Sequence, residues 1–177
     1  MRIFEKLDPN TIPDDPRVVF RFDYIATKLP YSYHHFDYLL IDGDYAIWAS
    51  RRFSENSMWG NVPRPAYWLG GSYIEFPKQG LPWFLWAIKE KFFKTEAEGG
   101  LERGKFTYSD EFNGEKLVVH RSFGIPGYVL ANHSRTEKNT FGRDEAQEYR
   151  FKDEMMFDNR LFEKLEIIAK KISSGEL

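Results

Sequence analysis

The chain has 177 residues, no cysteine, and 25 Lys and Arg against 27 Asp and Glu, which gives a net charge of −2. This length is enough for one domain that buries a core without cross-links. The lack of cysteine excludes disulfides, thiolate metal sites and thiol nucleophiles. Because the net charge is slightly negative, uniform attraction to a polyanion should be feeble, and any nucleic-acid contact must come from local clusters of basic residues.

The first residues and the overall hydropathy argue against export and membrane insertion. Residues 1–6 mix charged and apolar side chains and lack the apolar run of a secretory signal. No stretch approaches the length of about 20 apolar residues that a membrane-spanning helix needs. We therefore expect a protein that has no membrane partner and that is cytoplasmic, or associated with a nucleoid or nucleus.

The first half of the chain predicts a β-rich unit that closes with a helix. Residues 1–17 form a polar lead with several prolines, and the first unit covers residues 18–98. Alternating apolar and polar side chains indicate strands at 18–26, 36–41, 45–52 and 73–76. Asp42-Gly43 predicts a type I′ hairpin turn between the middle strands, and Pro82–Lys94 predicts a helix because proline fits a first helical turn.

The register of this hairpin divides its side chains between two faces. One face carries Phe36, Tyr38, Leu40, Tyr45, Ile47 and Ala49. The other carries Asp37, Leu39, Ala46 and Trp48. We expect the helices to pack on the first of these faces, because it is uniformly apolar.

The second half, residues 101–177, repeats this order of elements. Strands are predicted at 105–112, 115–122, 128–133 and 147–152. Asn113-Gly114 is a second hairpin signal, and Asp158–Ile172 predicts a helix with one apolar stripe. The sequence therefore predicts an α+β fold of two tandem β-β-β-β-α repeats, with curved antiparallel sheets and helices packed on one face, joined in one compact domain.

This order of elements resembles the single-stranded-DNA-binding fold shared by the Whirly proteins, the Pur-alpha repeats and the positive-cofactor-four coactivators. The resemblance is one of architecture and covers roughly residues 18–172, but the Lys-Gly-Lys-type motif of plant Whirly proteins is missing here. It implies a curved sheet that faces a nucleic-acid strand, helices packed behind that sheet, and a homo-oligomer.

Two windows of the sequence combine basic and aromatic residues and are nearly free of acids. Glu55 is the only acid between Tyr45 and Tyr73, and no acid occurs from Lys116 to Thr136. Single strands are bound by this combination, because basic side chains hold phosphates while aromatic faces stack on bases. We predict stacking by Trp48, Phe53, Trp59, Trp68, Phe123 and Tyr128. Phosphate contacts are predicted for Arg51, Arg52, Arg64, Lys116, Arg121 and Arg135.

The predicted function is therefore the binding of single-stranded DNA or RNA, with DNA preferred, in replication, recombination or transcription. We expect no catalytic residues and no cofactor. The sequence does not separate DNA from RNA, because no motif marks a contact to the 2′-hydroxyl.

Two alternatives stay open. The helix Pro82–Lys94 is apolar on nearly every face and must be buried all round, either by its own chain or by self-association. A protein-interaction or self-assembling module without a nucleic-acid ligand is the first alternative. A metal-dependent nuclease is the second and weaker one: Glu75 and Lys78 end a strand, but they lack the Glu-x-Lys spacing. The adjacent His34 and His35 would point to opposite faces of a strand, so we predict no metal site.

Overall fold

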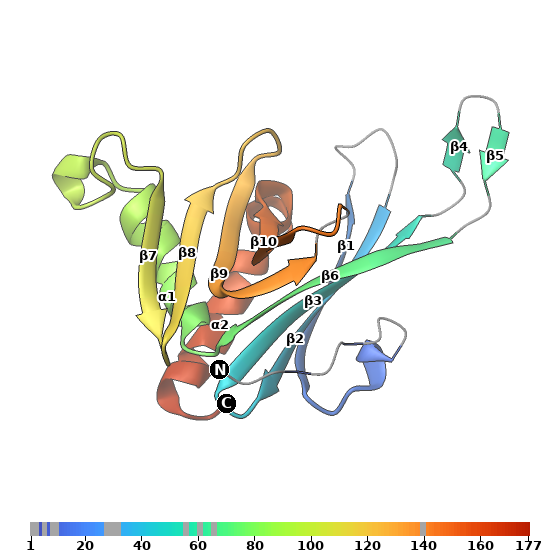
Figure 1. Ribbon diagram of the computed structural model, residues 1–177, viewed down its shortest axis with the longest axis horizontal. Helices are drawn as coiled ribbons and strands as arrows, with labels where there is room; N and C mark the ends of the chain where they lie inside the picture. Colours follow the sequence, from blue (N-terminus) through green and yellow to red (C-terminus); the bar gives the residue numbers. More distant parts are fainter. Residues whose placement is uncertain are drawn as a thin grey trace.

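Two antiparallel sheets of four strands each, both followed along the chain by a helix, make up the fold (Figure 1). This computed structural model describes residues 4, 7, 11–26, 33–54, 57–59, 62–64, 67–138 and 141–177. Within these ranges, the side chains of residues 26, 33, 54, 57–59, 62–64 and 67–70 are not described. The predicted α+β fold of two tandem units is confirmed.

The first sheet has the strand order β1-β2-β3-β6. Its strands are β1 (Val18–Ala26), β2 (Tyr33–Asp42), β3 (Tyr45–Ser54) and β6 (Tyr67–Pro77). A small hairpin, β4 (Ser57–Trp59) and β5 (Val62–Arg64), is inserted between β3 and β6. The β2–β3 turn differs from the prediction by one residue: Asp42 pairs with Tyr45, so Gly43 and Asp44 are the central residues. Gly43 alone has a positive φ, of 62°, as a type II′ turn requires at its first central position.

The first helix, α1 (Gly80–Ala87), continues into a π-helical segment, Ile88–Phe92. A short 3-10 turn, Glu96–Glu98, leads to the second sheet, whose order is β10-β9-β8-β7. Its strands are β7 (Thr107–Phe112), β8 (Glu115–Arg121), β9 (Gly127–Lys138) and β10 (Asp144–Lys152). A π-helical turn, Glu154–Asp158, precedes α2 (Leu161–Ser174). Asn113 and Gly114 both have positive φ, which confirms the predicted type I′ turn.

Both faces of the first sheet are covered, and the helices pack on the face opposite to the predicted one. Leu39, Ala46 and Trp48 are buried in the main core together with both helices. The second cluster contains Tyr38, Leu40, Ile47 and Ala49, covered by Phe4, Leu7 and Ile12. The helices were predicted to cover the face that carries this second cluster. That prediction is wrong, because the N-terminal lead covers this face. Alternation cannot rank two faces that are both buried.

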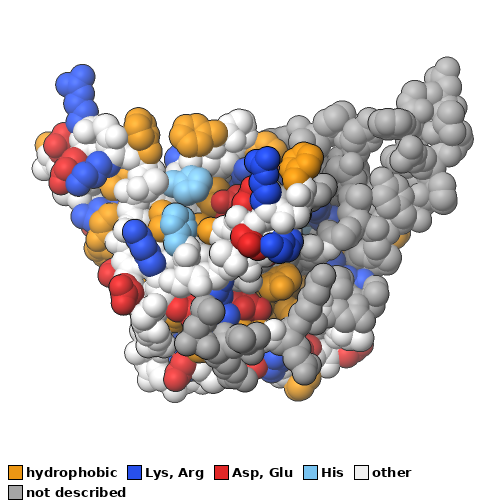
Figure 2. All heavy atoms as spheres, viewed as in Figure 1, with side chains coloured by type: hydrophobic (Ala, Val, Ile, Leu, Met, Phe, Trp, Pro, Cys, Tyr) orange, Lys and Arg blue, Asp and Glu red, His pale blue; other side chains and the backbone are white. Residues whose placement is uncertain are grey.

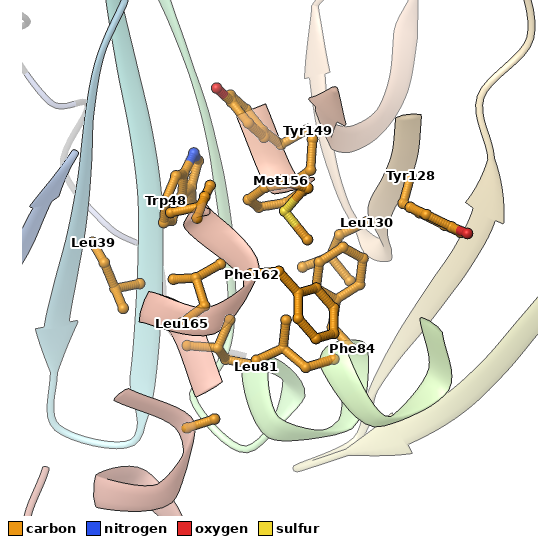
Figure 3. Close-up of a cluster of buried hydrophobic side chains, with 14 of the residues drawn as sticks. Leu39, Trp48, Leu81, Phe84, Tyr128, Leu130, Tyr149, Met156, Phe162 and Leu165 are labelled. Carbon is orange, nitrogen blue, oxygen red and sulfur yellow. The ribbon is translucent and has the colours of Figure 1, made fainter. Parts of the chain in front are cut away.

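Each helix reaches across to the sheet of the other unit. In α1, the Trp83 ring lies 6.1 Å from that of Tyr108 and 5.6 Å from that of Phe112, both on β7. In α2, the Lys164 ammonium lies 4.9 Å from the ring centre of Phe22 on β1. Figure 3 shows side chains of both units meeting in one cluster, for example Phe84 and Phe162. The two units therefore share a single core.

Where the two sheets meet, side chains of the second sheet complete the hydrogen bonds of an edge strand. The Asn132 Nδ2 of β9 donates to the backbone carbonyl of Glu75 on β6, at 2.9 Å. The backbone N–H of Glu75 donates to Gln147 Oε1 of β10, at 3.1 Å. Unpaired edge groups invite pairing with other chains, so these two amides both satisfy β6 and join the sheets.

Candidate nucleic-acid interface

The predicted site residues fall into a buried and an exposed group. Trp48, Arg51, Tyr128 and Arg135 are buried, and Phe53 is half-buried. Arg52, Lys116, Arg121 and Phe123 are exposed. The side chains of Trp59, Arg64 and Trp68 lie outside the described residues. The structure brings Arg121, Phe123 and Tyr128 together around the β8–β9 loop, whereas Lys116 lies at the other end of β8.

Trp48 and Tyr128 are not available for stacking on bases. Trp48 is 0% exposed, and its ring packs 5.1 Å from that of Phe151. Tyr128 is 4% exposed, with the Arg121 guanidinium 4.5 Å from its ring centre and the Phe92 ring 5.5 Å away. The stacking predicted for these two residues is wrong, because neither ring has an open face. Both side chains point toward the core because side chains alternate between the two faces of a strand. The aromatic content of a sequence window does not show which face each ring takes.

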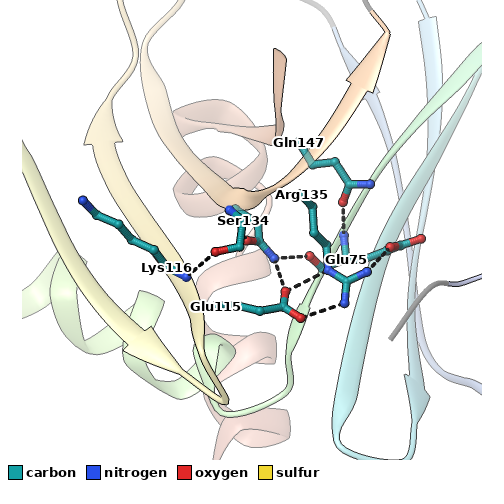
Figure 4. Close-up of polar contacts among 7 residues, drawn as sticks. Glu75, Glu115, Lys116, Ser134, Arg135 and Gln147 are labelled. Atoms are coloured by element: carbon teal, nitrogen blue, oxygen red, sulfur yellow. Dashed lines mark hydrogen bonds and ion pairs between the residues drawn. The ribbon is translucent and has the colours of Figure 1, made fainter. Parts of the chain in front are cut away.

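Arg135 is held in a buried ion network at the junction of the sheets (Figure 4). Its Nη1 donates to Glu75 Oε2 at 2.7 Å, and its Nε and Nη2 donate to the two carboxylate oxygens of Glu115 at 2.8 Å. Asn132 Nδ2 also donates to Glu115, at 2.7 Å. The predicted phosphate contact by Arg135 is wrong, because this guanidinium is already engaged. The same network occupies Glu75, the acid of the nuclease alternative.

The two carboxylates around Arg135 are affected differently. Burial raises the pKa of Glu75, and the contacts with Arg135 and Gln147 offset this only in part. Burial would also raise the pKa of Glu115, but hydrogen bonds from Arg135 and Asn132 lower it below the ordinary value. Both carboxylates of this network thus have Arg135 as a partner that favours their charged forms, although burial prevails at Glu75.

Arg51 and Arg52 point to opposite faces of β3. Arg51 is only 7% exposed and lies on the face that the N-terminal lead covers, so the phosphate contact predicted for it is wrong. Arg52 is exposed on the other face, the one that looks toward β10. One of the two adjacent arginines is therefore accessible to a ligand.

Arg52 belongs to a cation cluster that we define as Arg52, Arg150 and Lys152. None of the three forms an ion pair with any residue that the structure describes. Lys152 is half-buried, and its pKa is lowered first by burial and then by the positive charge of Arg52, with Arg150 adding to this effect. Glu154 acts in the opposite direction but more weakly than Arg52. Like charges from both sheets thus approach one another, and the nearby acids Glu154 and Asp37 offset this repulsion only in part.

The sequence windows missed Arg150 and Lys152. Both belong to β10, which begins with the acids Asp144 and Glu145, so the strand did not stand out as basic. The signal that could have found them is their spacing of two residues at the end of a strand, which places both side chains on one face.

An exposed aromatic patch lies at the β8–β9 loop, beyond the cation cluster. We define it as Phe93, Phe123, Ile125 and Phe157, which are 55%, 81%, 39% and 38% exposed. Phe93 and Phe157 are in ring contact at 5.9 Å, and both pack on Tyr128. Figure 2 shows hydrophobic side chains at the surface along the upper edge of the second sheet, with Lys and Arg side chains beside them. Large exposed rings gathered at one site mark a binding surface more often than scattered ones.

Backbone hydrogen bonds hold the β8–β9 loop, which carries Phe123. The Ser122 N–H donates to Gly127 O at 2.9 Å, and the Asp153 N–H donates to Pro126 O at 3.0 Å. A side chain at Gly127 would place its Cβ 2.6 Å from Phe151 O, so only glycine allows this close approach. The loop is thus tied to both the end of β9 and the end of β10.

Arg121 forms an ion pair with Asp153 at the base of this loop. Its Nη1 donates to Asp153 Oδ1 at 2.7 Å, and Nη2 donates to Oδ2. Hydrogen bonding to Asp153 is the main reason why the pKa of Arg121 is raised. Arg121 therefore adds little net positive charge while Asp153 is ionised.

A group of buried titratable residues lies beneath the cation cluster. Asp37 of β2 is 0% exposed, and the Tyr149 hydroxyl of β10 donates to its Oδ1 at 2.6 Å. Asp37 Oδ2 and His35 Nε2 have no hydrogen-bond partner within the described part of the chain. Burial raises the pKa of Asp37 to about 7 and, helped by Lys152 and Arg52, lowers that of His35 to about 3. Both groups are thus driven toward their neutral forms.

Three further features of the described residues concern metal binding, membrane insertion and a surface groove. No group of three or more His, Asp or Glu side chains among them gathers closely enough to hold a metal ion. No helix in the described ranges is long and apolar enough to cross a membrane. A groove of about 500 Å³ runs between α1 and α2, lined by residues such as Leu85, Trp86 and Ala169.

Comparisons with known proteins do not assign the chain to a family. No family model and no curated protein sequence matches the chain. Among solved structures, a chain titled "Crystal structures of trypanosoma bruciei MRP1/MRP2" is similar, with a TM-score of 0.40 and 13% identity. That similarity covers 85% of this chain and 92% of the other. What the present chain does therefore has to be inferred from its own residues.

Proposed function

We propose that this protein binds single-stranded nucleic acid along a surface that joins the cation cluster to the aromatic patch. The observation that carries this proposal is that Arg52, Arg150 and Lys152 converge from both sheets without an acidic partner in the described residues. A cluster of like charges is unfavourable in the free protein, and a polyanion relieves the repulsion. Phosphate groups are the natural ligands of such a cluster.

The aromatic patch supplies the second half of the interaction. Phe123 is 81% exposed on a loop that its backbone contacts hold in place, so stacking a base on it costs little ordering entropy. Bases in a duplex are already stacked and paired, whereas a single strand offers their faces. We therefore propose that the protein prefers single strands, with DNA as the first candidate and RNA to be compared directly.

Fluorescence anisotropy with labelled oligonucleotides tests this proposal. A single-stranded DNA, an RNA of the same sequence and the corresponding duplex DNA would be titrated at two salt concentrations. We expect tighter binding of a single strand than of duplex. In the double variant Arg52→Gln/Arg150→Gln, the salt dependence of log K should fall by about 1.4, since each phosphate contact contributes about 0.7 for single strands.

A matched control comes from α2, on the helix side of the molecule. Lys170 and Lys171 are as exposed as Arg52, so Lys170→Gln/Lys171→Gln removes the same charge at another place. This control should leave the salt dependence nearly unchanged. Equal effects of the two double variants would show that only net charge matters. Absence of binding to every single strand at low salt would overturn the proposal.

A self-assembling module is the second candidate, and the groove between α1 and α2 favours it. Most of the apolar surface of α1 is covered by its own chain, but Trp86 remains 44% exposed at this groove. We propose a homo-oligomer through this surface as the alternative. Sedimentation of the wild type and of Trp86→Ala at high micromolar concentration distinguishes it, because only an interface at the groove would be weakened by the substitution.

A further inference from the structure

We propose that binding of a nucleic-acid strand at the cation cluster is coupled to the uptake of a proton by the buried Asp37 carboxyl group. This inference rests on the proposed function and adds a regulatory property to the same site. The protein would then bind more tightly at mildly acidic than at mildly alkaline pH.

The geometry around Asp37 makes its charged form unfavourable. The residue is fully buried in the middle of the first sheet, on the face that packs against β10. One carboxylate oxygen accepts the Tyr149 hydroxyl, while the other has no partner in the described part of the chain. A buried charge with an unsatisfied oxygen is costly, and protonation removes the charge.

Charged and titratable groups face Asp37 from every element packed against it. They are Tyr24 of β1, Arg52 of β3, and Tyr149 and Lys152 of β10. His35 lies two residues away on the same strand, and Glu154 of the turn after β10 acts on Tyr24 and Lys152. The Tyr149 hydroxyl favours the ionised carboxylate, and so do, more weakly, the Trp48 indole N–H and the cations Lys152 and Arg52. Burial outweighs them and brings the pKa of Asp37 to about 7, so both protonation states are populated near neutral pH.

A bound strand would disturb this balance in one direction. Phosphates held by Arg52 and Lys152 offset the positive charge that favours the Asp37 carboxylate and add negative charge of their own. The neutral acid is then favoured, so the protein takes up a proton as it binds. By linkage, ionisation of Asp37 at higher pH must weaken binding of the strand by the same coupling.

Two other groups have to be separated from Asp37. His35 stays neutral at pH 7, because its pKa is about 3, and it would need a very large shift to contribute. Burial and the charge of Arg52 lower the pKa of Lys152, and a neighbouring phosphate would favour its charged form as well. A variant at Asp37 distinguishes the two sources, because Lys152 remains in place.

Isothermal titration calorimetry with a single-stranded 20-mer of thymidine tests the coupling. Measurement at pH 7 in two buffers with different ionisation enthalpies gives the number of protons taken up. We expect about half a proton for the wild type and none for Asp37→Asn. Between pH 6 and pH 8, wild-type affinity should fall by about three- to tenfold, while that of Asp37→Asn should stay nearly constant.

Tyr149→Phe provides a second variant that keeps Asp37. Loss of the hydroxyl removes a hydrogen bond that favours the carboxylate, so the fall in affinity should move to higher pH. Wild-type binding without proton uptake would overturn the inference alone, and so would uptake that persists in Asp37→Asn. If no single strand binds at all, the proposed function fails and the inference fails with it.

Discussion

Two buried polar clusters connect the two sheets of this protein, and they differ in how completely their groups are satisfied. In the network around Arg135, two carboxylates, two side-chain amides and one guanidinium are joined by hydrogen bonds of 2.7–3.1 Å. In the cluster around Asp37, the main contact is with the Tyr149 hydroxyl, the Trp48 indole N–H acts more weakly, and Asp37 Oδ2 and His35 Nε2 lack partners in the described residues.

This difference indicates that the two clusters have different roles, one in holding the fold together and the other in function. A network whose polar groups all have hydrogen-bond partners fixes the relative position of the sheets. An unsaturated cluster beneath exposed cations can change its protonation when those cations bind an anion. Buried groups with strongly shifted pKa values concentrate at functional sites for this reason.

The largest expected effect on stability comes from a substitution that breaks the network around Arg135. Arg135→Met leaves Glu75 and Glu115 buried without a counter-charge, and we expect a loss of about 3–5 kcal/mol in the free energy of unfolding. Urea denaturation at pH 7 measures it. Adding Glu75→Gln and Glu115→Gln to this variant should recover part of the stability. A loss below about 1 kcal/mol for Arg135→Met would show that the network is not needed for stability.

The next effect concerns the unsaturated cluster and its dependence on pH. In the folded protein, the pKa of Asp37 is raised from 3.8 to about 7, so folding is favoured by protonation and stability falls as pH rises through this window. The pKa of His35 is lowered from 6.5 to about 3, so its contribution to stability rises with pH between these values. In the wild type, the contributions of Asp37 and His35 to the pH dependence of stability therefore have opposite signs from about pH 4 to 6.5.

In Asp37→Asn, the pH dependence of stability should reflect His35 without the opposing contribution of Asp37. We expect the variant to gain stability relative to the wild type between pH 4 and pH 7, by about 2–4 kcal/mol, since one pKa unit corresponds to about 1.4 kcal/mol. Urea denaturation at several pH values measures the difference. His35→Gln should give the opposite trend. A stability difference between Asp37→Asn and wild type that does not change with pH would contradict the assignment.

These two clusters also show how far the sequence predicts this molecule. The order of strands and the positions of both helices follow from alternation, turn residues and an apolar stripe, because these are local properties. The partners of Arg135 are not local: Glu75 lies 60 residues away in the chain, and Glu115 lies 20 residues away. An acid-poor window therefore looked free of counter-charges, although its arginine is paired with acids from elsewhere in the fold.

The same limit explains the outcome for the candidate site. Exposed Phe123 and Arg52 are compatible with the predicted interface, whereas Trp48 and Tyr128 face the core. Composition identified a region rich in rings and cations. Which of those rings remain exposed depends on packing between strands that are far apart in sequence, and this could not be read from a single window.

A smaller effect concerns the aromatic patch, which contributes to binding and not to stability. Phe123→Ala removes an 81% exposed ring, and we expect single-strand binding to weaken by about 1–3 kcal/mol. The loss should be similar at every salt concentration, because no charge is removed. Ile167→Ala on α2, at a side chain that is 58% exposed, is the control and should leave binding unchanged. Equal binding by Phe123→Ala and wild type would exclude Phe123 from the interface.

The smallest expected effect contrasts an exposed ion pair with the buried network. Arg121 and Asp153 form a close pair, but their side chains are 45% and 29% exposed, so we expect Asp153→Asn to cost less than about 1 kcal/mol of stability. The same substitution frees the Arg121 charge next to Phe123. Single-strand binding should therefore become about two- to fivefold tighter at low salt, with the salt dependence of log K steeper by about 0.7.

Anisotropy titrations at two salt concentrations measure both quantities, and Arg121→Gln should shift them in the opposite direction. Unchanged affinity in both variants would place the strand away from the β8–β9 loop, since a phosphate at this loop must respond to either charge.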